Sequence, residues 1–284
     1  MNDELINANQ AMSIQRENEN AVFIDATFHL PNSGRSAEKE FINQHIPNAR
    51  FFDIDKIAKQ NTELPHMLPS EKEFCYFMSL LGIKSSDLII LYDNSVFFSS
   101  ARAWWMFKVF GHKKVYILNG GLKSWIKNGG KVTHEVNPFI KTNYINLSFK
   151  DELCEKIENI LDKIHINYSR VIIDARANER FNGLVDEPRP GLKKGRIPNS
   201  KNLPINSILN SETNCLKSDQ EIKTLFKNIG LVDTNSPITT TCGSGVTAAG
   251  LAFAAYRLGF SDIKVYDGSW VEWGSHKKTP IETN

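Results

Sequence analysis

One cysteine lies where the sequence could turn it into a nucleophile. Segment 238–241 (ITTT) favours a short buried strand, and segment 247–258 is apolar and alanine-rich, which favours a helix ended by Gly259. Cys242-Gly243-Ser244-Gly245-Val246 connects the two. A glycine-containing turn that leads into a helix presents free backbone N–H groups and the positive end of the helix dipole, and both stabilise an anion. We therefore expect Cys242 to favour the thiolate form and to act as a nucleophile.

The alternative is that Cys242 is a small buried hydrophobic residue, as free cysteines often are. The local pattern fits both interpretations. The organisation of the whole chain favours the first.

The sequence repeats itself after about 150 residues, which indicates a tandem duplication. Both halves contain a buried strand that ends in an acid (VFIDA and VIIDA), and both open a later helix with a capping box that starts at a serine. The matching segments occur in the same order: 22–26 with 171–175, 45–49 with 196–200, 70–82 with 218–230, 88–93 with 238–242, 110–117 with 258–265, and 120–125 with 268–273.

Each copy alternates strands with helices, which predicts two α/β domains, each with a mainly parallel central sheet flanked by helices. We place the first domain at residues 1–136, a linker at 137–150 and the second domain at 151–284. The first copy has Asp93 at the position of Cys242, in a loop without glycine. We interpret Asp93 as a solvated or helix-capping carboxylate, and the first copy as the one that does not carry the chemistry.

Composition narrows the classes of function. The net charge is +2 and no basic tract is present, so neither a nucleic acid nor a membrane is an expected partner. No apolar run approaches the roughly 20 residues that span a bilayer. The polar, acidic N-terminus argues against a targeting segment. The four cysteines form no CxxC pair, which suggests neither a disulfide framework nor a metal site, so we expect a cytoplasmic protein.

Two α/β repeats, with an aspartate in the first loop and a cysteine in the second, resemble the tandem-domain rhodaneses, a family of sulfurtransferases. The loop Cys242–Thr247 (CGSGVT) is more similar to that of 3-mercaptopyruvate sulfurtransferases than to that of thiosulfate sulfurtransferases. The latter carry cations directly after the cysteine, where this chain has Gly243 and Ser244. Thiosulfate is a dianion that favours cations in the loop, whereas mercaptopyruvate has one carboxylate that other residues can hold.

The resemblance also implies the remaining site residues. Arg180 and Arg189 match the two arginines that bind the substrate's carboxylate and keto oxygen, a role that suits the guanidinium fork. Asp55 and His66 match residues that reach across the domain interface to the loop serine, here Ser244, and such a trio could move protons. Alternatively, Arg180 and Arg189 are surface charges, and Asp55 and His66 are interface partners without a catalytic role.

The predicted activity is transfer of sulfur from 3-mercaptopyruvate through a Cys242 persulfide to a thiol, cyanide or a thioredoxin-type protein, with release of pyruvate. The N–H groups of Gly243, Gly245, Val246 and Thr247 would stabilise the charged sulfur. No metal or organic cofactor is expected.

Three other functions use a similar scaffold. The first is thiosulfate:cyanide sulfurtransfer, and the second is a non-catalytic binding module of the rhodanese fold. The third is a cysteine phosphatase, which would need an arginine where this chain has Ala248.

Overall fold

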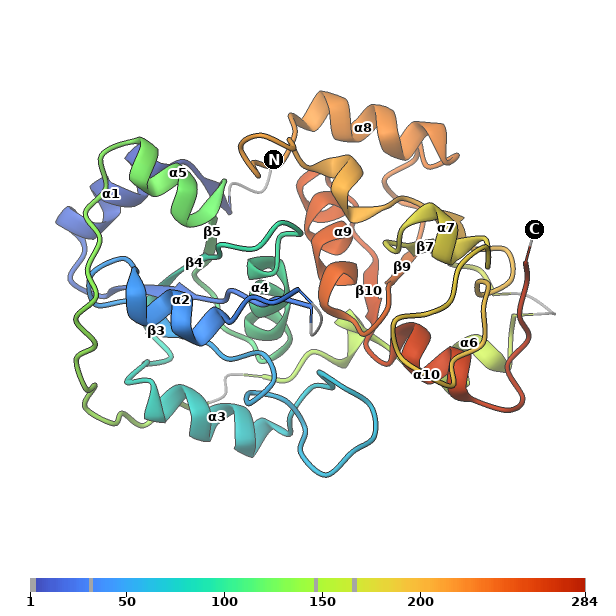
Figure 1. Ribbon diagram of the computed structural model, residues 1–284, viewed down its shortest axis with the longest axis horizontal. Helices are drawn as coiled ribbons and strands as arrows, with labels where there is room; N and C mark the ends of the chain where they lie inside the picture. Colours follow the sequence, from blue (N-terminus) through green and yellow to red (C-terminus); the bar gives the residue numbers. More distant parts are fainter. Residues whose placement is uncertain (1–3, 31–32, 146–147, 165–167, 284) are drawn as a thin grey trace.

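The chain folds into two α/β domains, each built on one parallel sheet. The computed structural model describes residues 4–30, 33–145, 148–164 and 168–283 (Figure 1). In this part of the chain the two sheets have five strands each, in the orders β1-β5-β4-β2-β3 and β6-β10-β9-β7-β8, and every neighbouring pair is parallel. The second order repeats the first, so the duplication read from the sequence is confirmed as a repeat of topology.

The strands of the first domain are β1 (Leu5–Ile6), β2 (Ala21–Asp25), β3 (Arg50–Phe51), β4 (Leu88–Tyr92) and β5 (Val115–Leu118). Its helices are α1 (Ala8–Glu17), α2 (Ala37–Asn43), α3 (Glu71–Leu80), α4 (Ser100–Val109) and α5 (Gly121–Lys127).

The strands of the second domain are β6 (Cys154–Glu155), β7 (Val171–Asp174), β8 (Lys201–Asn202), β9 (Ile238–Thr241) and β10 (Ile263–Tyr266). Its helices are α6 (Ile157–Leu161), α7 (Asn178–Phe181), α8 (Asp219–Asn228), α9 (Val246–Arg257) and α10 (Ser269–Ser275), with 3₁₀ turns η1 (Asp151–Leu153) and η2 (Ile205–Ile208).

Local sequence signals account for several of these boundaries. The predicted capping boxes are present, because the side chains of Ser70 and Ser218 accept from backbone N–H groups in the first turns of α3 and α8. Gly82 and Gly230, each two residues after the last residue of its helix, have φ values of 66° and 86°. Glycine adopts this left-handed conformation without steric cost, which explains why both helices stop there.

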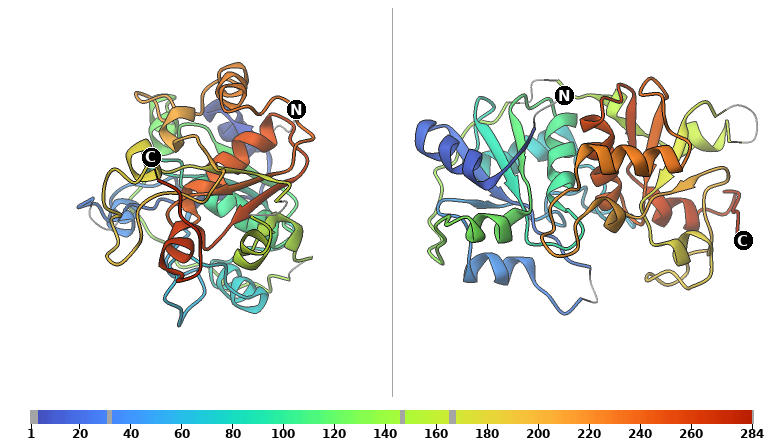
Figure 2. Two further views of the ribbon diagram at one scale, coloured as in Figure 1. Left: turned by 90° about the vertical axis from the view of Figure 1, so that its right-hand side faces the viewer. Right: turned by 90° about the horizontal axis from the view of Figure 1, so that it is seen from above.

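Helices cover both faces of each sheet (Figures 1 and 2). In the first domain α1, α2 and α5 share one buried cluster with the sheet, whereas α3 and α4 belong to a second, larger cluster. In the second domain α8 and α9 belong to that same larger cluster. The apolar core is therefore continuous from one domain to the other.

The two domains meet where α4 packs against α9, and aromatic rings fill the contact. Phe253 of α9 lies edge-on to Trp104 of α4, with ring centroids 4.9 Å apart, and edge-on to Phe98 at 5.6 Å. Figure 1 shows the two helices side by side in the middle of the molecule. Because α9 starts at the cysteine loop, this contact holds the first domain against the helix that follows the predicted nucleophile.

The described part of segment 137–150 contains no helix or strand. It runs along the first domain, where Tyr144 packs edge-on against Phe74 with ring centroids 5.9 Å apart. None of the described helices combines the length and the apolar character that crossing a membrane would require.

Candidate active site

Cys242 lies at the carboxyl end of β9, directly before the turn that opens α9. The Gly245 backbone has φ +80° and ψ −13°, so the chain turns through a left-handed residue before the helix starts at Val246. Cys242 is 2% exposed, and Ser244 is 9% exposed. The thiol therefore lies at the floor of the site, and a sulfur donor has access to only a small part of it.

The start of α10 holds the cysteine loop in place. The N–H of Cys242 donates to Ser269 Oγ at 3.1 Å, and the N–H of Trp270 donates to the Cys242 carbonyl at 2.9 Å. The next loop carbonyl, that of Gly243, accepts from Val271 at 2.9 Å. Among the hydrogen bonds of the described residues, none uses the N–H groups of Gly243, Ser244 or Gly245. These three donors are available to a bound anion.

Arg180 lies against the same loop. A Cβ atom built on Gly243 would stand 3.2 Å from Arg180 Nη2. Glu187 holds this guanidinium, because its Oε2 accepts from Nη2 at 2.5 Å and from Nε at 3.2 Å. A buried Arg176 binds the other oxygen of Glu187 at 2.7 Å and binds Asp174 at 2.7 Å on its far side. Glu187 therefore holds Arg180 through Nε and Nη2, and Nη1 of Arg180 takes no part in this ion pair.

Arg189 is half-buried and lies within electrostatic range of the same groups. Burial and the neighbouring charge of Arg180 lower the pKa of Arg189, whereas Cys242, Asp55 and Glu187 act in the opposite direction. An anion placed between the two arginines would relieve their mutual repulsion. The structure thus places Arg180 against the cysteine loop, and Arg189 within electrostatic range of Arg180 and Cys242.

The first domain contributes two polar side chains, Asp55 and His66, which form a chain of three with Ser244 of this loop. His66 Nδ1 lies 2.9 Å from Ser244 Oγ, and His66 Nε2 lies 2.9 Å from Asp55 Oδ1. The imidazole is buried, and Phe28 packs edge-on against it with a centroid distance of 4.9 Å. Asp55 is exposed, so the outer end of this chain is open to solvent.

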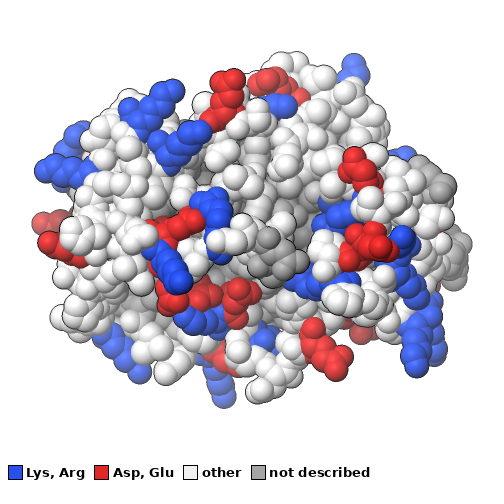
Figure 3. All heavy atoms as spheres, viewed as in Figure 1, with Lys and Arg blue, Asp and Glu red and all other residues white. Residues whose placement is uncertain are grey.

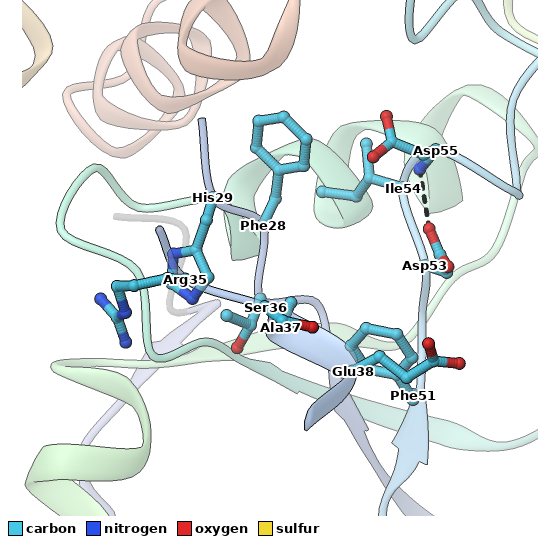
Figure 4. A pocket seen from close by; sticks show the side chains of 11 residues that line it. Phe28, His29, Arg35, Ser36, Ala37, Glu38, Phe51, Asp53, Ile54 and Asp55 are labelled. Atoms are coloured by element: carbon cyan, nitrogen blue, oxygen red, sulfur yellow. Dashed lines mark hydrogen bonds between the residues drawn. The ribbon is translucent and has the colours of Figure 1, made fainter. Parts of the chain in front are cut away.

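A polar hollow of about 260 Å³ adjoins Asp55 in the first domain (Figure 4). Figure 4 shows Asp55 at one end of the hollow and His29 and Arg35 at the other, with Phe28 between them. In the view of Figure 3, charged side chains of both signs gather on the α2 side and on the α7 side of the molecule. The lining residues are Thr27, Phe28, His29, Arg35, Ser36, Ala37, Glu38, Phe51, Asp53, Ile54 and Asp55.

Asp93, the counterpart of Cys242, is buried and caps its own loop. Its carboxylate accepts from the N–H of Ser95 at 3.0 Å and from the N–H of Ser100, the first residue of α4, at 2.8 Å. Of the two interpretations of Asp93, the helix-capping carboxylate is therefore the correct one. The acid that these N–H groups bind is therefore a side chain of the protein and not a bound ligand.

Sequence reasoning missed several residues that shape the site: Arg102, Arg176, Glu187, Asp267 and Ser269. A signal existed for Arg102, because it is the one charged residue within the apolar segment 101–107. Ser269 has φ +50° and aligns with Gly121 of the first copy, whose φ is +54°. A serine in place of a glycine at such a position points to a use for its hydroxyl, here the bond to Cys242.

No group of three or more His, Cys, Asp or Glu side chains in the described ranges is arranged to hold a metal ion.

Comparison with known proteins identifies the class. A model of the rhodanese-like domain matches the chain twice, at residues 8–128 and 154–276. The chain belongs to the rhodanese family, in the form that has two domains in tandem.

Relatives within the family are more specific. The chain is 39% identical over 260 residues to the 3-mercaptopyruvate sulfurtransferase of Escherichia coli (strain K12), covering 91% of each. It is 38% identical over 271 residues to the Mus musculus protein of that name, covering 93% of this chain and 88% of the relative. Among solved structures, SseA from Escherichia coli superimposes with a TM-score of 0.83 at 34% identity, covering 94% of this chain and 98% of that one.

Proposed function

We propose that this protein is a 3-mercaptopyruvate sulfurtransferase in which Cys242 carries the sulfur. The observation that carries the proposal is that Arg180 lies against the Cys242 loop, while Ser244 of the same loop contacts His66 of the other domain. The names of the relatives support the choice of donor.

In the first half-reaction the Cys242 thiolate attacks the sulfur of 3-mercaptopyruvate. A sulfur–sulfur bond forms, the carbon–sulfur bond breaks, and its electron pair leaves on carbon as the enolate of pyruvate. Protonation of that carbon completes pyruvate and leaves Cys242 as a persulfide.

The arginines bind the substrate, and the three hydrogen-bonded side chains Ser244, His66 and Asp55 supply the proton. Arg180 and Arg189 bind the carboxylate and the keto oxygen, which also stabilises the charge on the enolate. Ser244 Oγ donates the proton to the enolate and regains one from His66, whose imidazole is oriented by Asp55. The free N–H groups of Gly243 and Gly245, with those of Val246 and Thr247 at the helix start, stabilise the anionic sulfur.

In the second half-reaction an acceptor takes the outer sulfur of the persulfide. We propose a small thiol, cyanide or a thioredoxin-type protein, each of which attacks that sulfur and releases the Cys242 thiolate. No cofactor enters either step.

We further propose that residues 1–136 form the non-catalytic domain, 137–150 the linker and 151–284 the catalytic domain. We also propose a cytoplasmic location, because the four cysteines are widely spaced in the sequence and form no CxxC pair.

The test is the intact mass of the protein after exposure to 3-mercaptopyruvate without an acceptor. We expect one added sulfur atom on the wild type and on a Cys215→Ser control, none on Cys242→Ser, and one pyruvate for each sulfur bound. Wild-type pyruvate release by Cys242→Ser would refute the proposal. Faster persulfide formation from thiosulfate than from 3-mercaptopyruvate would instead support the thiosulfate alternative.

A further inference from the structure

A charged residue is sealed between the two domains. Arg102 lies in α4, has an exposed fraction of 0%, and stacks its guanidinium over the Trp105 ring at 4.6 Å. Burying a guanidinium is costly unless its donors are paired, and an apolar side chain of similar size would hold two helices together at least as well. The contacts of this arginine therefore need an explanation beyond packing.

The hydrogen bonds of Arg102 lead to the proposed proton path. Arg102 Nη2 donates to the backbone carbonyl of His66, and Nη1 lies 3.4 Å from the carbonyl of Gly245, the residue after Ser244. One guanidinium thus touches the backbone on both sides of the hydrogen bond between His66 and Ser244.

Asp267, in the second domain, completes this arrangement. Its Oδ1 accepts from Arg102 Nη1 at 2.7 Å, which balances the buried charge. Its Oδ2 accepts from the N–H of Leu68, two residues after His66, also at 2.7 Å. The segment that carries the histidine is therefore attached to Asp267 of the second domain in two ways, directly through the N–H of Leu68 and indirectly through Arg102.

The backbone of His66 requires this support. Its φ of +62° is a left-handed conformation, which costs a non-glycine residue energy and persists only where surrounding contacts enforce it. In this conformation the imidazole bridges Ser244 and Asp55. We propose that Arg102, together with Asp267, is a positioning residue that holds His66 in hydrogen-bonding contact with Ser244 when the domains are closed. The kinetic part of this proposal rests on the proposed function, whereas the geometric part does not.

The geometric part is tested by NMR of the histidine ring nitrogens. In the wild type we expect the His66 signals, assigned by their loss in His66→Gln, to report hydrogen bonds at both nitrogens. Arg102→Lys keeps the charge beside Asp267 but cannot reach both carbonyls. We expect it to shift the His66 signals toward those of a free imidazole. Arg170→Lys is the control, because Arg170 is also mostly buried and ion-paired, but with Asp262 at the opposite end of β9.

The kinetic part is tested by a double-mutant cycle on pyruvate release in a single turnover. If Arg102 acts through His66, Arg102→Lys lowers the rate about 10- to 100-fold in the wild-type background and less than about 3-fold in His66→Gln. A purely structural role would give the same loss in both backgrounds. The Arg102→Met, Asp267→Asn double variant removes both charges together and should fold even if Arg102→Lys does not. It is expected to show the same coupling and the same shift of the His66 signals.

The two readouts separate the possible failures. If the wild type releases no pyruvate, the proposed function is wrong, and the NMR comparison still decides whether Arg102 positions His66. Unchanged His66 signals in the Arg102 variants, or equal losses in both backgrounds, would overturn the inference.

Discussion

Two aspartates at equivalent strand ends show how residues that look alike in the sequence acquire different chemistry. Asp25 ends β2 and Asp174 ends β7, and both are buried. Asp174 faces Arg176, whose Nη2 lies 2.7 Å away. The corresponding neighbour of Asp25 is Thr27, whose N–H and hydroxyl both donate to Oδ1. Burial raises the pKa of Asp25 to about 7, since two hydrogen bonds do not replace a cation.

This difference predicts a pH-dependent loss of stability. The folded pKa of Asp25 lies above its unfolded value, so the folded state favours the protonated acid, and stability falls as pH rises from about 4 to about 7. Asp25→Asn keeps an acceptor for Thr27 and never ionises. We expect its gain in unfolding free energy over the wild type to be about 2 to 3 kcal/mol larger at pH 8 than at pH 5.

Scanning calorimetry of both proteins at the two pH values checks this expectation, with Asp174→Asn as the matched control. That variant removes an ion pair and leaves Arg176 with Glu187 alone, so it should be destabilised at both pH values. A gain for Asp25→Asn that does not change with pH would contradict the assignment.

At the scale of single residues, the sequence indicated the position of the nucleophile but not the surroundings of the two buried acids. The position of Cys242 followed from strand and helix propensity and from glycine, which are local properties. The difference between Asp25 and Asp174 depends on whether a cation two residues later turns back toward the acid. That orientation is a property of packing, so the repeated phrase VFIDA and VIIDA could not reveal it.

The two loops that follow β4 and β9 share their backbone support but differ in their side chains. In each domain the residue at the cysteine position accepts, through its carbonyl, an N–H from the helix after the next strand. Asp93 accepts from Leu122 at 3.0 Å, and Cys242 accepts from Trp270 at 2.9 Å. The backbone support was therefore kept in both copies. The chemistry differs because side chains of the first domain, among them Asp93 and Ser95, accept from the amides of its loop, whereas the cysteine loop leaves amides free.

Gly245 is the residue of this element that tolerates least change. A Cβ there would lie 2.7 Å from the backbone oxygen of Asp267 and 3.1 Å from Arg102 Nη1, in addition to the strain of φ +80°. We expect Gly245→Ala to lower kcat/KM for the sulfur donor by at least about 100-fold, because the loop must shift relative to the arginines and His66.

Gly259 provides the matched control for this prediction. Its φ is +90°, but nothing lies within 4 Å of its Cβ position. Gly259→Ala should therefore cost only the conformational strain, about 1 to 2 kcal/mol in unfolding free energy, and leave steady-state activity near the wild-type level. Similar activities for the two variants would show that the shape of the loop is not what limits catalysis.

At the scale of the whole molecule, the fold could be predicted from the sequence and the interface could not. Strands, capping boxes and the duplication are periodic or local signals. The contact between His66 and Ser244 was expected only through the family resemblance. Nothing local indicated that Arg102 would reach Gly245 or that Asp267 would bind Leu68, because these pairs are far apart in the chain and depend on how the domains dock.

The site is complete only when the domains are docked, since the proposed nucleophile and arginines come from one domain and His66 from the other. The apolar side of that docking is the cluster of Phe98 and Trp104 around Phe253. Catalysis should therefore respond to the packing of α4 on α9 even where no side chain touches the substrate.

Phe253→Leu tests this dependence. The variant keeps most of the buried volume but loses two edge-on ring contacts, so it should lose about 1 to 2 kcal/mol of stability. We expect kcat/KM for the sulfur donor to fall about 5- to 50-fold under conditions where the protein stays folded, because a small shift between the domains lengthens the His66–Ser244 contact.

Phe226→Leu is the control, since Phe226 is equally buried but packs on Phe260 within the second domain. It should be destabilised to a similar degree and change kcat/KM less than about 2-fold. Equal kinetic effects of the two substitutions would mean that domain docking contributes stability alone and does not tune the site.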